Sequence, residues 1–328
     1  MAKWTPLIAL WLAVPLQAAD AIPESRLEKG SVRFKVIGDQ KAVPEMYRLA
    51  DHEFSWEMEP KLALDGTGVK VFCVRFPSPV ESPVKENNTV HAEYYRPEGK
   101  GPFPAVVVLD ITGGDQTLSR VIATHLASNK ICGLFVQMAY YGPRRPAGSN
   151  LRLMTPDLKK TTEGVRQTVL DVRRASAWLE ARPEVDAKQI GVMGTSLGSF
   201  VATLSAEMEP RFCRLAVLLG GGGLVDGYWD HPKAVPYRKI YELLGGTKDK
   251  VKALFAPIDP ITCAGNLKDR QVLIVAGKRD DIVPPQCAEA LWQACGKQKI
   301  IWYDCTHYGA IVYIIPGLNN VVKHFRPE

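Results

Sequence analysis

One short run constrains the fold of this chain more than any other. The apolar stretch 189–193 runs directly into Gly-Thr-Ser-Leu-Gly at 194–198, and a helical pattern follows. A strand that turns into a helix through Gly-x-Ser-x-Gly has no room for side chains at the two glycines and places its serine on a sharp, exposed turn. A second apolar strand follows at 214–219. This order predicts a parallel sheet with Ser196 at the carboxyl edge of its strands, where open α/β sheets bind ligands.

Ser196 is the candidate nucleophile, the alternative being an incidental serine in a tight turn. A serine hydroxyl needs a histidine within hydrogen-bond reach, and that histidine needs a carboxylate to orient it. The strand 271–276 ends in Gly-x-x-Asp-x-x-Val-Pro, which makes Asp280 the candidate acid and its neighbour Asp281 the rival. His307 follows the last expected strand and is the candidate base.

A serine that attacks a carbonyl group creates an oxyanion, which we expect backbone N–H groups to stabilise. In a site of this kind the first donor comes from the residue after the nucleophile, here Leu197. The second is expected from the loop after the strand 104–110, where Ile111 and Thr112 are the candidates. The paired glycines at 113–114 would permit close backbone approach there, or they simply make the turn into the next helix.

The chain order serine, acid, histidine resembles that of the α/β-hydrolase superfamily, over roughly residues 70 to 325. The segment 171–198 is similar to the branch that holds dienelactone hydrolases, acetyl xylan esterases and prolyl-oligopeptidase-like proteins. Dienelactone hydrolases carry cysteine at the turn, so Ser196 favours ester or peptide hydrolysis. The loop 111–115 departs from the His-Gly-Gly of many relatives. The resemblance implies an α/β-hydrolase fold: a mostly parallel eight-stranded sheet, helices on both faces and a small lid insertion.

The alternating and apolar segments of the sequence supply the expected strands. An antiparallel pair opens the sheet, and six further strands complete it. The expected ranges are 69–76, 89–95, 104–110, 132–138, 189–193, 214–219, 271–276 and 299–304.

The chain divides into three parts, the last of which contains a lid insertion. Residues 1–21 have the pattern of a secretory signal peptide, because the apolar run 6–16 is followed by small residues and is too short to span a bilayer. The alternative is a short membrane anchor. We expect a secreted or periplasmic protein without stable membrane insertion. An N-terminal extension follows at 22–66, with one expected strand at 32–37, and 67–328 form the catalytic domain, with the lid at about 221–262.

Composition excludes several classes of partner. The chain has 328 residues, 46% of them hydrophobic, and a net charge of +6. Its basic residues are dispersed, so nucleic acid is not an expected partner. Seven cysteines show no Cys-x-x-Cys or Cys/His ligand spacing, which predicts no structural zinc, and no cofactor is expected. Cys73 and Cys132 lie in expected strands and suit small buried hydrophobes.

Two segments are expected to shape the substrate pocket. Arg144 and Arg145 lie in an irregular loop near the active-site edge, where they either contact an acidic substrate or belong to a solvated loop. Trp229, Tyr237 and Tyr241 lie in the expected lid, where they either stack on a sugar or acyl group or only pack the lid.

These features predict a secreted serine hydrolase that cleaves carboxylic esters through an acyl-enzyme intermediate. Its substrate is expected to be a small-molecule or carbohydrate ester. A prolyl-oligopeptidase-like serine peptidase and a catalytically silent binding protein on the same scaffold are the alternatives.

Overall fold

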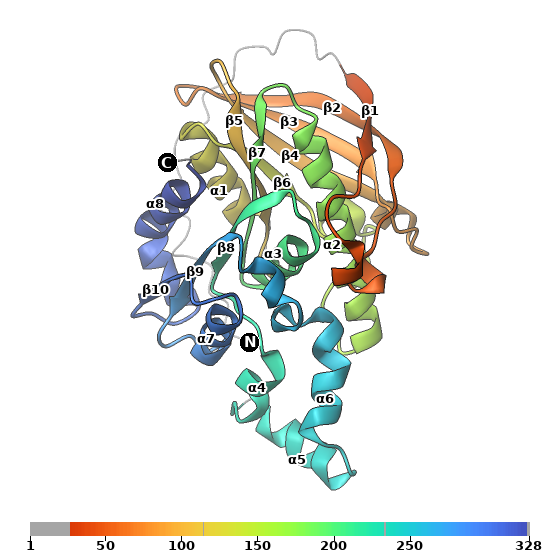
Figure 1. Ribbon diagram of the computed structural model, residues 1–328, viewed down its shortest axis with the longest axis vertical. Coiled ribbons are helices and arrows are strands. Elements are labelled where there is room, and N and C mark those ends of the chain that lie inside the picture. The colour runs from red at the N-terminus through yellow and green to blue at the C-terminus, as the bar shows by residue number, and fades with distance from the viewer. Residues whose placement is uncertain (1–26, 114, 233, 327–328) are drawn as a thin grey trace.

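A single sheet organises the molecule. The computed structural model describes residues 27–113, 115–232 and 234–326, so the expected signal peptide lies outside the described residues. The strands are β1 (Glu28–Phe34), β2 (His52–Leu64), β3 (Val69–Pro77), β4 (Thr89–Pro97), β5 (Phe103–Leu109), β6 (Cys132–Val136), β7 (Val185–Thr195), β8 (Phe212–Leu218), β9 (Gln271–Gly277) and β10 (Lys299–Tyr303). Their order across the sheet is β1-β2-β3-β4-β6-β5-β7-β8-β9-β10 (Figure 1).

The sheet has an antiparallel and a parallel part. Strands β1 to β4 pair antiparallel, and β4 pairs antiparallel with β6. From β6 onward the pairings through β5, β7, β8, β9 and β10 are all parallel. The parallel strands therefore bring their carboxyl ends, and the loops after them, to one edge.

The predicted number of eight strands is wrong: ten lie in the described part of the chain. The N-terminal extension was expected to hold one strand at 32–37, but it forms both β1 and β2, which continue the same sheet. Phe54, Trp56 and Met58 alternate along β2 and point into the main core, where the Trp56 ring meets the edge of Trp178 at 6.0 Å. This alternation is the ordinary signal of a half-buried strand.

Helices cover both faces of the sheet, as expected. The helices are α1 (Thr117–Ser128), α2 (Leu158–Glu180), α3 (Leu197–Met208), α4 (Leu224–Trp229), α5 (Val235–Leu243), α6 (Lys248–Phe255), α7 (Pro285–Ala294) and α8 (Ile314–Phe325). Successive residues of a strand face opposite sides. Val106 and Val108 of β5 accordingly share a core with α1 and α8, whereas Val107 and Leu109 share the other core with α2 and α3.

The expected lid insertion lies between β8 and β9. It contains α4, α5 and α6, which project beyond the carboxyl edge of the sheet (Figure 1). Neither α5 nor α6 has a buried residue. Within the residues the structure describes, no helix combines the length and apolar character needed to cross a bilayer.

Candidate active site

The turn at Ser196 joins β7 to α3 and is strained. The backbone of Ser196 has φ 52° and ψ −118°, a conformation that residues with a side chain rarely adopt. Its N–H donates to the carbonyl of Leu218 at 2.8 Å, which ties the turn to β8. A Cβ at Gly194 would lie 2.1 Å from the carbonyl oxygen of Gly198, and one at Gly198 would lie 2.4 Å from that of Asp110. The two glycines are therefore required by the close approach of strand and helix.

Ser196, His307 and Asp280 form a continuous hydrogen-bonded line. The Nε2 atom of His307 lies 3.1 Å from Ser196 Oγ, and Nδ1 lies 2.8 Å from Asp280 Oδ2. His307 and Asp280 are buried, whereas Ser196 is partly exposed. The three residues come from the loops after β10, β9 and β7, so the parallel strands bring them to one edge of the sheet. This geometry suits a histidine that accepts the serine proton while a carboxylate holds its ring.

Local hydrogen bonds fix the carboxylate of Asp280. Its Oδ1 accepts from the N–H groups of Ile282 and Val283, at 2.9 and 2.8 Å, which leaves Oδ2 directed at the histidine. The rival Asp281 is exposed. The loops that carry the acid and the base are joined by backbone hydrogen bonds, such as the one from the N–H of Arg279 to the carbonyl of Cys305 at 3.1 Å.

The candidate oxyanion donors lie on two elements. Leu197 is the first residue of α3, so its N–H is one of the helix N-terminal groups that have no acceptor within the helix. Ile111 is not among the described residues that line the cavity beside Ser196. Thr112 lines the same cavity as Ser196 and Leu197. Of the two candidates in this loop, Thr112 is therefore the better placed.

A tyrosine that sequence reasoning missed holds this loop. The N–H of Gly113, the residue after Thr112, donates to the hydroxyl oxygen of Tyr141 at 3.1 Å. Tyr141 follows β6 and is half-buried. Its position after a parallel strand, in a loop expected near the active-site edge, was the one available signal.

Asp110, at the end of β5, lies beside the same loop. Burial raises the pKa of its carboxyl, although the hydrogen bond from the Ser119 hydroxyl favours the charged form. Asp110 contacts α1 through Ser119 and α3 through its own carbonyl, which faces Gly198. Asp110 therefore connects the end of β5 to α1 and to the first turn of α3.

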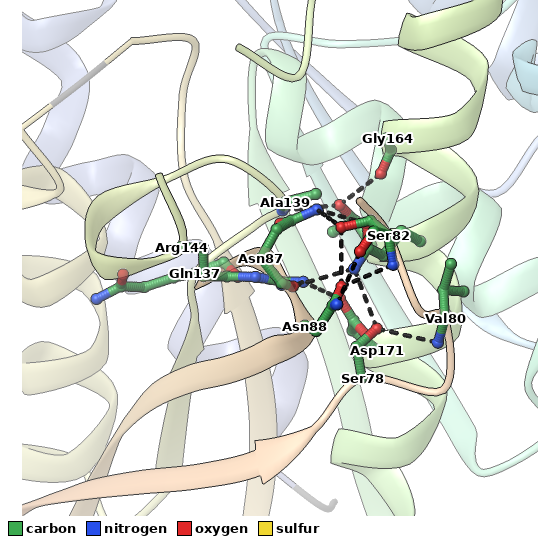
Figure 2. Close-up of polar contacts among 12 residues, drawn as sticks. Ser78, Val80, Ser82, Asn87, Asn88, Gln137, Ala139, Arg144, Gly164 and Asp171 are labelled. Atoms are coloured by element: carbon green, nitrogen blue, oxygen red, sulfur yellow. Dashed lines mark hydrogen bonds and ion pairs between the residues drawn. The ribbon is translucent and has the colours of Figure 1, made fainter. Parts of the chain in front are cut away.

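Arg144 is part of a buried polar network (Figure 2) and is not exposed to contact an acidic substrate. Its Nη2 lies 2.7 Å from Oδ2 of Asp171 on α2, and both side chains are 0% exposed. The guanidinium also donates to the carbonyls of Gln137 and Asn87, at 2.9 and 2.8 Å. Neither expectation for Arg144 was right, because its partner lies on a helix that no local pattern connects to this loop.

A cavity of about 580 Å³ opens beside Ser196. Its walls come from the nucleophile helix α3, the lid and α2, and its lining is mainly aliphatic and aromatic. All three aromatic residues expected to shape the pocket, Trp229, Tyr237 and Tyr241, line it. A second cavity, of about 670 Å³, lies at the base of the lid, and Ser196, Asp280 and His307 are not among the described residues that line it.

The described cysteine, histidine and carboxylate side chains form no group of three or more that could hold a metal ion. All seven cysteines are free thiols, of which Cys132 is buried and Cys73 half-buried.

Sequence comparison relates part of the chain to known proteins. Residues 162–308, which contain all three residues of the hydrogen-bonded line, match the prolyl oligopeptidase family. One similar protein, an uncharacterized protein of Mycobacterium tuberculosis, is 28% identical over 166 residues, which are 47% of this chain and 36% of that protein. Another from the same organism is 26% identical over 63% of each chain. This chain thus matches about a third of the first relative's length.

Structural comparison points the same way. Acetyl xylan esterase 1 from Thermoanaerobacterium sp. JW/SL YS485 superposes with a TM-score of 0.61 at 19% identity, over 82% of this chain and 88% of that one. The acetyl xylan esterase from Paenibacillus sp. R4 gives 0.63 at 17% identity with the same coverage. A dienelactone hydrolase, named as putative, from Klebsiella pneumoniae gives 0.53 at 16% identity, over 78% and 98%.

The sheet, the strained serine turn and these similarities show that the chain has the α/β-hydrolase fold, as the sequence predicted. Residues 162–308 resemble the prolyl oligopeptidase family in sequence, and the fold is similar to those of acetyl xylan esterases and a dienelactone hydrolase.

Proposed function

We propose that the protein is an exported serine hydrolase that cleaves carboxylic esters through an acyl-enzyme intermediate. The observation that carries this proposal is the unbroken line from Ser196 Oγ through the His307 ring to Asp280, at one end of a cavity large enough for a small organic substrate. The esterase neighbours favour esters over peptides, and the signal pattern of residues 1–21 supports export.

In the first half of the reaction, Ser196 Oγ attacks the ester carbonyl carbon while its proton passes to His307 Nε2. The carbonyl oxygen becomes an oxyanion, which the N–H groups of Leu197 and Thr112 stabilise. The bond from the carbonyl carbon to the alcohol oxygen then breaks. That oxygen takes the proton from His307, so the alcohol leaves neutral and the acyl group stays on Ser196.

In the second half, a water molecule attacks the acyl carbon and gives its proton to His307 Nε2. Collapse of the second oxyanion breaks the bond to Ser196 Oγ, which takes the proton back, and the carboxylic acid is released. Asp280 stays charged throughout and stabilises the imidazolium through Nδ1.

The test is hydrolysis of p-nitrophenyl esters by the chain starting at residue 22, beside Ser196→Ala and His307→Ala. Removing a member of such a triad costs at least roughly 10⁴-fold in kcat. We expect a loss of that size in both variants with an unchanged unfolding midpoint. Ser128→Ala, at an exposed serine that ends α1, is the matched control and should keep full activity.

Two other outcomes would replace this proposal. Turnover of peptide substrates with none of esters would favour the peptidase that the family match also permits. If the folded protein hydrolyses neither substrate and Ser196 does not react with a fluorophosphonate probe, the protein is a binding protein on this scaffold. An N-terminus between residues 19 and 22, in protein recovered outside the cytoplasm, would support the export part.

A further inference from the structure

The lining of the cavity beside Ser196 is suited to an apolar group. Besides the site residues, it consists almost entirely of aliphatic and aromatic side chains. Those contributed by the sheet side of the cavity are Val165, Phe200, Val201, Leu204, Ile282 and Val283. The lid closes the other side with Leu224, Val225, Tyr228, Trp229, Ala234, Tyr237, Tyr241, Val251 and Phe255.

Two of the polar groups in the lining are already engaged within the protein. The hydroxyl of Tyr228 donates to the carbonyl of Ile282. The guanidinium of Arg238 donates to the carbonyl of Trp229 at 3.1 Å, contacts Asp230 and lies 3.7 Å from Glu242. A sugar ring would bury several hydroxyls here and needs a hydrogen-bond partner for each of them. These engaged groups make the cavity a poor site for carbohydrate.

The cavity lies on the acyl side of the reacting bond. Ser196, Leu197 and Thr112 line it, so the acyl carbon and the oxyanion sit at its mouth. The leaving alcohol must lie next to His307 Nε2, which protonates it, and His307 is not among the described residues that line the cavity. The chain attached to the carbonyl carbon therefore extends into the cavity, and the alcohol lies outside it.

We infer that the preferred substrates are esters of medium-chain, apolar carboxylic acids, an inference that rests on the proposed ester hydrolysis by Ser196. An eight-carbon acyl chain needs about 240 Å³ if each carbon takes up about the 30 Å³ that a water molecule occupies in the liquid. The cavity of about 580 Å³ accommodates such a chain, whereas an acetyl group leaves most of it empty.

The first arm of the test compares p-nitrophenyl acetate, butyrate, hexanoate and octanoate. Burying one methylene contributes about 0.8 kcal/mol, about fourfold in kcat/KM when burial is complete. We expect kcat/KM to rise at least tenfold from acetate to octanoate. A flat or falling series, with Ser196-dependent turnover of acetate, would overturn the inference and leave the proposed function standing.

The second arm fills part of the cavity with a phenyl ring at Ala234, a lid residue that lines it. Ala234→Phe should lower the octanoate-to-acetate ratio of kcat/KM at least fivefold. Ala253→Phe is the matched control, because Ala253 is exposed on α6 and is not among the residues that line the cavity, and it should keep the wild-type ratio. If the octanoate-to-acetate ratio of kcat/KM is the same in both variants, the acyl chain binds outside this cavity.

The third arm measures ligand binding without turnover. The affinities of Ser196→Ala for octanoate and acetate are determined by calorimetry. Binding of octanoate at least tenfold tighter than acetate, and weakened by Ala234→Phe, supports the apolar acyl site even if the ester chemistry fails. Equal binding of the two acids overturns it.

Discussion

The nucleophile helix and the lid face each other across one cavity, yet they are held in opposite ways. Every residue of α3 except Phe200 is buried, and its first turn meets the backbone of β5 and β7 at glycine contacts. No residue of α5 or α6 is buried, and Leu243 and Leu244 are more than four-fifths exposed. Ser196 thus stands on an element fixed by packing, while much of the cavity wall stands on elements fixed by surface contacts.

The ion pairs of the two regions differ in the same way. Arg144 and Asp171 are wholly removed from water. Asp226 of α4 binds Lys248 and Lys252 of α6 where all three side chains are exposed to between a third and half of their surface. Breaking a buried pair leaves an uncompensated charge, whereas water replaces most of what a surface pair supplies.

The largest effect is expected from Arg144→Met. It leaves the carboxylate of Asp171 buried without its cation, which typically costs about 3 to 5 kcal/mol of unfolding free energy. Urea denaturation followed by circular dichroism measures it. The double variant Arg144→Met/Asp171→Leu removes both charges and should recover most of the loss. A loss of unfolding free energy below about 1 kcal/mol in the single variant would mean that water reaches the Arg144–Asp171 pair. The pair would then not differ from the exposed ion pairs of the lid.

Glu207→Gln tests burial on α3 itself. Glu207 is 3% exposed, and neither of its carboxyl oxygens has a hydrogen-bond partner among the described residues. Burial raises its pKa well above the ordinary value, and the nearby charge of Asp259 adds to the shift. The folded protein therefore retains a proton that the unfolded chain releases above about pH 4.3.

The stabilising effect of that proton is complete below the unfolded pKa and is lost as the pH rises toward the folded one. Glutamine has no proton to lose, so the unfolding free energy of Glu207→Gln should exceed that of the wild type by an amount that grows between pH 4 and 8. Urea titrations across this range measure the difference. Glu289→Gln, at an exposed glutamate of α7, should show no such trend. A pH-independent difference for Glu207→Gln would mean that its carboxyl is hydrated.

The sequence could predict the features whose signal lies within one short segment or follows from the pairing of parallel strands. The turn at Ser196 is local, because the glycines on either side of the serine are demanded by contacts within a single strand-turn-helix unit. Asp280 and His307 each follow an apolar strand, so parallel pairing alone brings them to the edge where Ser196 lies. The central fold and the proximity of these three residues were therefore within reach of sequence reasoning.

Other features depend on pairings that no local pattern contains. Arg144 meets Asp171 only because α2 packs behind the loop that follows β6, so a basic, proline-rich loop looked solvated. Tyr141 contacts Gly113 from another strand end for the same reason. In β2, by contrast, the alternation of buried residues was present in the sequence and sufficient to predict the strand.

The smallest effect is expected from Asp226→Asn, and it sharpens the comparison most. The two lysines lower the pKa of Asp226, so its contribution to stability is present at neutral pH and lost as the pH falls through that lowered pKa. Because the pair is exposed, the variant should lose less than about 1 kcal/mol at low salt, and less still at high salt.

The control for Asp226→Asn is Glu59→Gln, which breaks the similarly exposed pair with Arg75 on the sheet. Both variants should change unfolding equally little, but only Asp226→Asn loosens α4 from α6 and should lower the octanoate-to-acetate ratio of kcat/KM, by about twofold. If this ratio is unchanged while stability falls by the same small amount, the lid side of the cavity does not depend on the surface contacts of the lid. The two sides of the cavity would then be equally fixed, and the contrast between them would concern only how they are exposed to water.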